Sequence, residues 1–455
     1  MIKNMNKKRF SILVILLVAI LGLYQYYQHQ QLKERIRHAL SYLQTSISSQ
    51  NQNTLTASNE SMKEEAKIDS IQVDPQVMND VVNANNQLAL NLYIKLKKEK
   101  GNIFFSPYSI LTALATMQEG AHGKTAEEIQ ALLNINLDEA KRSAFRKIYK
   151  RFNQINSPYQ IAIANGLWAQ HDYKFLEIYK DVLREYYGAE AHNVDFKYSA
   201  KEAVLKINSW VANRTNNKIK NVIETLDPLV RLVFVNAAYF KAPWVDEFNK
   251  YQTAVEDFRV SPSDIVKVAM MKKMDDHSGT CYAYAETEDL QILEMDYKGG
   301  RFSMLIFLPK QDDLVSLENS FSIKRINEWR NLLKCESGNV FIPKFTMNYQ
   351  YPLKEILEGV GASTMFLPCV DPLKPMDCAD FSRMDGSRFL FINSITHQTF
   401  LNVDEEGTEA AAVTEYKPYY LSSTFFEFRA DHPFIFLIQE KENGNILFLG
   451  RLLQP

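Results

Sequence analysis

The sequence predicts an α+β fold in which helices come first along the chain and strands come later. Leu88, Leu92 and Leu96 recur at four-residue steps, which places them on one face of a helix. Further along, residues 231–235, 303–308 and 434–438 form short runs of bulky apolar residues, as buried strands do. Helices followed by strands indicate a mixed domain with large, mostly antiparallel sheets.

Two local motifs predict where a helix begins and where a hairpin turns. Thr125 and Glu128 have the spacing of a helix capping box ahead of an apolar helical stretch. Asn443 and Gly444 are typical turn residues just ahead of the apolar run 446–449, which predicts a hairpin. The patterned sequence continues from residue 75 to residue 455 with no second linker and no internal repeat. We therefore expect one large domain over residues 75–455.

The composition is that of a globular protein with a large core. The 455 residues are 46% hydrophobic and 23% charged, which is ordinary for a folded domain. The formal net charge of -2 argues against a nucleic-acid partner, since proteins that bind many phosphates carry an excess of Lys and Arg. We expect no nucleic-acid binding.

The first 28 residues differ from the rest of the chain. Lys7, Lys8 and Arg9 precede an uninterrupted apolar run at residues 10–24, which is typical of an export signal and short for a membrane-spanning helix. Two interpretations of residues 1–28 stay open, a cleaved signal peptide and a retained membrane tether through residues 10–24. Both place the rest of the chain outside the cytoplasm, because the positive charges precede the apolar run.

Residues 29–74 are rich in Gln, Ser, Asn and Thr and show no strand pattern, so we interpret them as a polar spacer. Apolar residues between Leu32 and Ile47 recur at steps of four and three, which predicts a short helix. This helix is either a solvated part of the spacer or an interface for a partner, and the shortness of the pattern favours the first.

Common catalytic and metal-binding motifs are absent from the sequence. Gly123-Lys124-Thr125 imitates the end of a phosphate-binding loop, but Gln118 stands where that loop needs its first glycine. The eight histidines lack zinc-protease spacing, and no G-x-S-x-G elbow occurs. The four cysteines form no C-x-x-C motif; Cys369 and Cys378 are close in sequence, and whether they form a disulfide stays open. We expect no catalysis, no metal and no cofactor.

One segment near the C-terminal end has an unusual composition for a loop. It consists of Glu405, Glu406, Gly407, Thr408, Glu409, Ala410, Ala411, Ala412, Val413 and Thr414. In a strand, every second residue from Thr408 to Thr414 would point to one face, and side chains this small could enter an existing sheet without overpacking it. A helical alanine stretch on an exposed loop is the alternative interpretation.

The segments around this loop resemble the serpin superfamily in five motifs, which come in the family's order within residues 75–455. These motifs are NIFFSPYSI at 102–110, NAAYFKAPW at 236–244, DFS at 380–382, HPF at 432–434 and FLGR at 448–451. The resemblance implies the serpin fold, with helices packed on a large central mixed β-sheet, two further sheets, and an exposed reactive-centre loop at about residues 405–428.

The resemblance also implies roles for single residues. Ser106, Ser109, Asn236 and His397 match the polar cluster, called the shutter, beneath the point where the main sheet opens. Trp244 matches the aromatic residue at the top of the opening, called the breach, and residues 405–414 match the hinge of the loop. Taken alone, Ser106 could equally be a helix cap, and His397 a satisfied core histidine.

As a serpin, the chain would be a single-use inhibitor with no catalytic residues of its own. The resemblance implies that a serine protease cleaves the loop, forms an acyl ester and is trapped when the hinge inserts into the main sheet. The family's spacing from Glu405 places the reactive bond between Leu421 and Ser422, and the neighbouring bonds after Tyr420 and after Ser422 stay open as alternatives. Leu421 suits a chymotrypsin-like pocket. The expected partner is the target protease, in a covalent complex with a monomeric serpin domain.

Two alternative functions stay open, a non-inhibitory carrier or chaperone and an inhibitor of a papain-like cysteine protease. Three positions depart from the family's pattern. Ala242 stands where glycine is usual, Gln398 follows His397 where lysine is frequent, and Tyr416 would bring a ring to the inward face of an inserted strand. None of these positions lies in the hinge, so we expect inhibition.

Overall fold

The computed structural model describes residues 70, 72–154, 157–274, 281–369, 378–408 and 425–455. The predicted leader, the spacer up to residue 69, the hinge beyond Thr408 and the bond between Leu421 and Ser422 lie outside the described residues. Within the described part of the chain, no helix combines the length and the apolar composition that crossing a membrane requires.

In the described part of the chain, most helices lie ahead of residue 232 and most strands lie after it, in agreement with the order that the sequence predicts. In chain order the helices are α2 (Pro75–Leu96), α3 (Pro107–Gly120), α4 (Gly123–Leu133), α5 (Glu139–Phe152), α6 (Glu177–Val182), η1 (Leu183–Tyr187), α7 (Phe196–Arg214), α8 (Leu314–Ser320), α9 (Ile323–Leu332), α10 (Leu353–Gly359), η2 (Thr364–Phe366) and α11 (Ser382–Asp385). α2 begins where the Asp74 carboxylate accepts the backbone N–H of Gln76. The predicted apolar face of this helix is confirmed, because Leu88, Leu92 and Leu96 are all buried.

The predicted capping box at the start of α4 is wrong. The helix begins at Gly123, ahead of the motif, and His122 at its N-cap makes no side-chain capping bond. The Thr125 hydroxyl instead accepts the backbone N–H of Asp380 at 3.0 Å, and the Glu128 carboxylate accepts backbone N–H groups at the start of η2. Partners from a distant segment have therefore replaced the local cap.

Within the described residues, the strands form two sheets. In chain order they are β1 (Ile103–Phe105), β2 (Gln160–Gln170), β3 (Glu190–Val194), β4 (Leu232–Pro243), β5 (Ala254–Ser261), β6 (Asp264–Lys273), β7 (Tyr282–Glu286), β8 (Leu290–Asp296), β9 (Phe302–Pro309), β10 (Lys334–Pro343), β11 (Phe345–Pro352), β12 (Ile392–Val403), β13 (Gly407–Thr408), β14 (Phe425–Arg429), β15 (Phe434–Glu440) and β16 (Ile446–Leu452). The predicted strands and the predicted hairpin are confirmed as β4, β9, β15 and the β15–β16 pair.

The described residues place ten strands in one sheet and six in the other. The larger sheet has the order β1-β16-β15-β9-β8-β7-β10-β6-β5, with β14 beside β10. The smaller sheet has the order β11-β12-β4-β2-β3, with β13 beside β4. It is mixed, because β4 runs parallel to β12 and β2 parallel to β3, while the β2–β4 and β11–β12 pairs are antiparallel.

The predicted fold class is confirmed, with one refinement. The two further sheets that we expected beside the central mixed sheet are joined through β10. The first half of β10 pairs with β7, and its second half pairs with β6 and β14. One strand therefore belongs to both.

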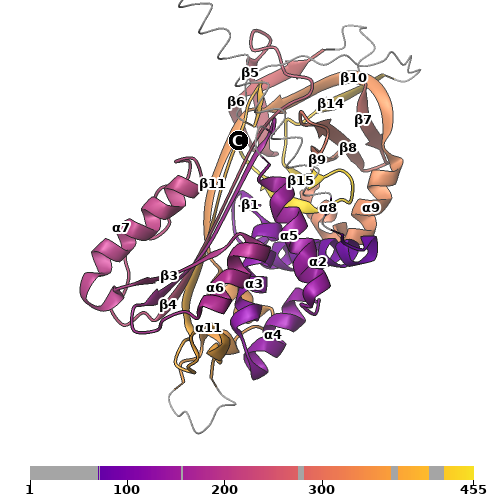
Figure 1. The fold of residues 1–455 in the computed structure, drawn as a ribbon. Helices are drawn as coiled ribbons and strands as arrows, with labels where there is room; N and C mark the ends of the chain where they lie inside the picture. Colours follow the sequence, from indigo (N-terminus) through magenta and orange to yellow (C-terminus); the bar gives the residue numbers. More distant parts are fainter. Residues whose placement is uncertain (1–69, 71, 155–156, 275–280, 370–377, 409–424) are drawn as a thin grey trace, which may run out of the picture. The chain divides into compact units, whose positions relative to one another are not determined.

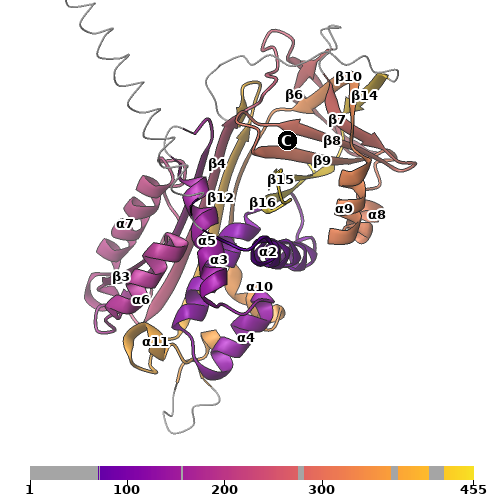
Figure 2. The same cartoon turned by 45° about the vertical axis from the view of Figure 1, so that its right-hand side comes forward.

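Helices cover both faces of the six-stranded sheet, with α7 on one side and α3 on the other (Figure 1, Figure 2). Ile207 and Val211 of α7 share a buried cluster with Val233 and Val235 of β4. On the opposite face, α3 reaches β4 at Asn236. Because successive strand residues point to opposite faces, β4 contributes to two separate cores.

All four cysteines are paired in disulfides. Cys369 pairs with Cys378, which was one of the two outcomes left open by the sequence. Cys281 pairs with Cys335, and the sequence did not predict this pair. Its basis is the pairing of β7 with β10, which brings two segments 54 residues apart in sequence side by side.

Candidate functional site

The centre of the six-stranded sheet is a parallel pair of strands, β4 and β12. Leu232 lies opposite Ile392, and the pairing continues to Tyr239 opposite Phe400. Parallel pairs are slightly less stable per residue than antiparallel pairs. We name this pair the seam. A strand that ran antiparallel to both neighbours could take a place between them.

A buried polar cluster crosses the middle of the seam. Asn236 of β4 and His397 of β12 lie directly opposite each other and share a hydrogen bond between Oδ1 and Nδ1. Asn236 Nδ2 also donates to the Ser109 hydroxyl at 2.7 Å, and the backbone N–H of Ser106 donates to His397 Nε2 at 3.0 Å. The four residues that match the family's shutter thus lie together, although 291 residues separate Ser106 from His397.

These contacts define the protonation state of His397. Because its Nε2 accepts a hydrogen bond, the proton of the neutral ring is on Nδ1 and is donated to Asn236. The side chain is fully buried, and burial lowers the pKa of His397 to about 3. His397 is therefore neutral at pH 7 and joins the two strands by hydrogen bonds rather than by charge.

Two further observations concern the members of this cluster. Ser106 is also a helix cap, because its hydroxyl accepts the N–H of Ser109 at the start of α3; the capping interpretation of Ser106 is therefore confirmed. Asn165 of β2 belongs to the cluster and was missed by the sequence reasoning, although its buried Oδ1 accepts from Asn236. Its sequence signal is a single amide inside an apolar strand, which does not distinguish a site residue.

At one end of the seam the chain turns back on itself. Asp404 and Gly407 each donate a backbone N–H to the other's carbonyl, which closes a tight turn after β12. Gly407 and Thr408 then form β13, antiparallel to Pro243 and Ala242 at the end of β4. The pairing of β4 with β12 ends before these two residues. β13 therefore occupies the first positions of a strand between β4 and β12.

Gly407 is required at this point of the chain. Its φ is +139°, and a Cβ atom there would lie 2.4 Å from the carbonyl oxygen of Ala242. Ala242 itself, where the family usually has glycine, is fully buried and pairs with Thr408 in regular register. The departure at Ala242 thus leaves the start of β13 intact.

Trp244 lies against the turn at the end of the seam. Its indole N–H donates to the carbonyl of Asp404 at 3.1 Å, and its backbone N–H donates to the carbonyl of Glu406 at 3.0 Å. Its ring stacks on Tyr297 with 4.4 Å between centroids. The Tyr297 hydroxyl lies 3.1 Å from the Thr408 hydroxyl. The structure thus places Trp244 against the turn at the end of the seam, and Tyr297 is a partner that the sequence did not reveal.

Glu405 anchors the turn to neighbouring segments. Its buried carboxylate accepts from Lys344 Nζ at 2.7 Å and from the Thr253 hydroxyl at 2.7 Å. Burial raises the pKa of Glu405, but these two hydrogen bonds outweigh it and hold the pKa below its ordinary value. Among the described residues, no group of three or more His, Cys, Asp and Glu side chains could hold a metal ion.

A family model described as serpin (serine protease inhibitor) matches residues 83–455. The chain belongs to the serpin family. An uncharacterized serpin-like protein of Thermococcus kodakarensis is 38% identical over 382 residues, which cover 82% of this chain and 86% of that protein. Human leukocyte elastase inhibitor is 34% identical over 393 residues, which cover 83% of this chain and all of that protein. The crystal structure of human thyroxine-binding globulin has a TM-score of 0.74 at 29% identity, covering 83% of this chain and 99% of that one.

In this serpin, three features follow one another along β4 and β12: the turn at residues 404–407, the short strand β13, and the polar cluster. The predicted hinge is described as far as Thr408. Residues 409–414 of the hinge, together with Leu421 and Ser422, lie outside the described residues.

Proposed function

We propose that this serpin is a suicide inhibitor of a serine protease, whose cleaved loop inserts as a strand between β4 and β12. The observation that carries the proposal is β13, because Gly407 and Thr408 already pair with β4 in the antiparallel direction that an inserted strand would take. The similarity to human leukocyte elastase inhibitor supports an inhibitory role.

The register of β13 gives an inserted strand a defined course. If the pairing of Thr408 with Ala242 continued along β4, Thr414 would come to lie opposite Asn236. Thr414 would then enter between Asn236 and His397 and part the hydrogen bond that they now share. Its hydroxyl could serve as the new partner of either side chain. The position of the polar cluster therefore supports insertion along this course.

Insertion would replace one parallel ladder by two antiparallel ladders. Each backbone hydrogen bond gained contributes about 1 kcal/mol, and antiparallel pairs are slightly more stable than parallel ones. The small side chains on one face of residues 408–414 would limit the cost of overpacking. The free energy that drives trapping would thus come from backbone pairing at the seam.

The target protease would supply the chemistry. Its serine Oγ attacks the carbonyl carbon of Leu421, the peptide bond to Ser422 breaks, and the leaving amine takes a proton from the protease's histidine. The hinge would insert before water hydrolyses the ester, and distortion of the oxyanion hole would stop that hydrolysis. The large apolar side chain of Leu421 favours a chymotrypsin-like pocket.

The experiment is to mix the full-length protein with chymotrypsin, trypsin or papain, and to analyse the products by denaturing gel and mass spectrometry. We expect a denaturant-stable adduct with chymotrypsin at the summed mass, and a released peptide that begins at Ser422. An adduct with papain alone would shift the target to cysteine proteases. Cleavage without any adduct would overturn inhibition and favour a carrier; a solved structure similar to this chain, thyroxine-binding globulin, is named for binding a small molecule.

We also propose that the serpin domain, residues 75–455, acts outside the cytoplasm as a monomer behind the spacer at residues 29–74. The positive charges ahead of residues 10–24 support export, and the pairing of all four cysteines supports an oxidising compartment. N-terminal sequencing of the exported protein distinguishes the two interpretations of residues 1–28. A cleaved signal gives a new N-terminus within this range, and a retained tether keeps the apolar run and sediments with membranes.

A further inference from the structure

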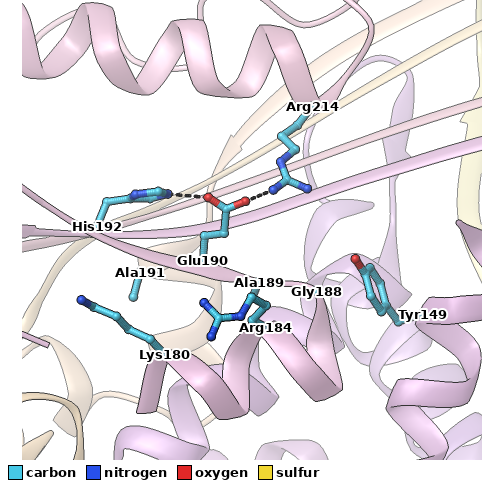
Figure 3. A pocket seen from close by; sticks show the side chains of 9 residues that line it. All are labelled: Tyr149, Lys180, Arg184, Gly188, Ala189, Glu190, Ala191, His192 and Arg214. Atoms are coloured by element: carbon cyan, nitrogen blue, oxygen red, sulfur yellow. Dashed lines mark ion pairs between the residues drawn. The ribbon is translucent and has the colours of Figure 1, made fainter. Parts of the chain in front are cut away.

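A basic cavity of about 230 Å³ lies away from the seam, among α5, α6, η1, β3 and the end of α7 (Figure 3). Three of the side chains that line it are cations from three elements, Lys180 of α6, Arg184 of η1 and Arg214 of α7. The hydroxyl-bearing ring of Tyr149 from α5 lies on the remaining side. Residues far apart in sequence are thus brought to one cavity.

The cations of this cavity outnumber its carboxylates. Glu190 is the one acid that lines the cavity, and its oxygens are already engaged. They form an ion pair with Arg214, accept the Trp210 indole N–H at 3.0 Å and lie 2.8 Å from His192 Nε2 (Figure 3). Glu190 therefore leaves Lys180 and Arg184 without a carboxylate partner inside the cavity.

The other partners of these two cations lie outside the cavity on the same helical turns. Lys180 pairs with Glu177, whose side chain is 80% exposed, and Arg184 pairs with Asp181, whose side chain is 60% exposed. Ion pairs between such exposed groups contribute between zero and about 1 kcal/mol and exchange readily with solvent. An anion inside the cavity could therefore recruit both cations at little cost.

We propose that this cavity binds a compact oxyanion with two negative charges, the chemistry that a phosphate group and a sulfate group share. Arg184 and Arg214 would approach it from two sides with their planar forks, which match tetrahedral oxyanions. Lys180 would add a point charge, and the Tyr149 hydroxyl a neutral donor. The site is separate from the seam and does not depend on whether the serpin inhibits a protease.

Binding at this cavity would be visible in two measurements. The Arg214 guanidinium lies 5.8 Å from the Trp210 ring centroid, so a ligand that draws Arg214 inward changes the surroundings of that indole. A ligand that binds the folded state alone also raises the melting temperature as its concentration increases. Together these measurements report contact with the cavity and the free energy of binding.

The test is a titration of the full-length protein with inorganic phosphate at constant ionic strength, followed by tryptophan fluorescence and by melting temperature. We expect saturable changes in both, and at least about a tenfold loss of affinity in Arg184→Ala, because a charge-assisted hydrogen bond is lost. Arg184 is 73% exposed and forms its ion pair with the exposed Asp181, so this variant keeps the fold. The double variant Arg184→Ala/Arg214→Ala should lose more.

The matched control removes two exposed cations far from the cavity, Lys267→Ala/Lys324→Ala, each of which also has one carboxylate partner. This control should bind inorganic phosphate as the wild type does. A parallel titration with a sulfated disaccharide distinguishes a phosphate ligand from a sulfate ligand, because the ligand with the higher affinity identifies the group that the cavity prefers. Absence of saturation with both ligands, or equal affinity in Arg184→Ala and the wild type, would overturn the proposal.

Discussion

The two sheets of this serpin bury their central strands in different ways. In the ten-stranded sheet, β9, β15 and β16 are antiparallel neighbours, and every one of their residues is buried. At the seam of the six-stranded sheet the neighbours are parallel, and the residues that meet at its middle are the polar Asn236 and His397. Parting β9 from β15 would expose apolar side chains to water at about 25 cal/mol per Å². Parting the seam would break one parallel ladder and a few hydrogen bonds, and the strand of the proposed function would pair with β4 and β12 again, so we expect the fold to open at the seam.

The largest expected effect tests the apolar core of the ten-stranded sheet. Leu437→Ala in β15 removes a fully buried side chain, and we expect the free energy of unfolding to fall by about 2–5 kcal/mol. The intact and the loop-cleaved protein should lose similar amounts, because β15 keeps its neighbours in both. Denaturant unfolding measures both losses. Leu332→Ala, at a side chain that is half exposed, is the control, and an equal loss there would contradict the comparison.

The next effect places a charge in the path of insertion. Thr414→Arg would bring a cation to the inward face beside Asn236 if the register of β13 continues. A buried unpaired charge costs several kcal/mol, so the ratio of trapped to hydrolysed product should fall by about 100-fold or more. Glu409→Arg is the matched control, because this side chain would lie on the opposite face beside Lys241. Equal losses in the two variants would show that the loop inserts in another register.

A smaller effect concerns the hydrogen bonds across the seam. Asn236→Ala removes the acceptor of the buried His397 Nδ1–H and the donor to Ser109. Leaving such groups unsatisfied costs about 1–3 kcal/mol, which should appear as reduced stability of the uncleaved protein. Asn83→Ala, on the exposed surface of α2, should change stability by less than about 0.5 kcal/mol. If both variants unfold alike, the polar cluster does not hold the seam.

The smallest effect is a dependence on pH. The pKa of His397 is about 3 in the folded protein, well below the ordinary histidine value of 6.5, so the unfolded chain takes up this proton first as the pH falls. The stability that neutral His397 contributes is complete above pH 6.5 and should drop by about 1 kcal/mol between pH 6.5 and pH 5.5. His397→Gln should flatten the stability curve in this window. An unchanged slope in the variant would assign the pH dependence to other groups.

Much of the fold was predicted from the spacing of apolar residues and from runs of bulky apolar residues, because each of these signals lies within a single segment. The spacing of Leu88, Leu92 and Leu96 requires only that one helical face meets a core, and their burial follows from it. The run at residues 303–308 is likewise apolar on both faces because β9 is covered on both. The resemblance to the family predicted that Ser106 and His397 belong to one cluster, and periodicity alone could not have predicted this.

The missed features all depend on partners from distant segments. Thr125 has the sequence pattern of a helix cap, but its hydroxyl accepts a hydrogen bond from the backbone N–H of Asp380 instead. The pairing of Cys281 with Cys335 requires knowing that β7 lies beside β10. Asn165 became part of the polar cluster only because β2 pairs with β4. Such contacts are set by topology, and no local pattern encodes them.

The seam has one more property that follows from its geometry. If the seam opens as proposed, β4 would offer unpaired backbone groups where it parts from β12, and a neighbouring molecule's loop carries the same residues as the molecule's own. Which of them enters is a competition between the effective concentration of the tethered loop and the bulk concentration of its neighbours. At high protein concentration the molecules should therefore link into chains, whereas at low concentration each molecule should stay monomeric and able to inhibit one protease.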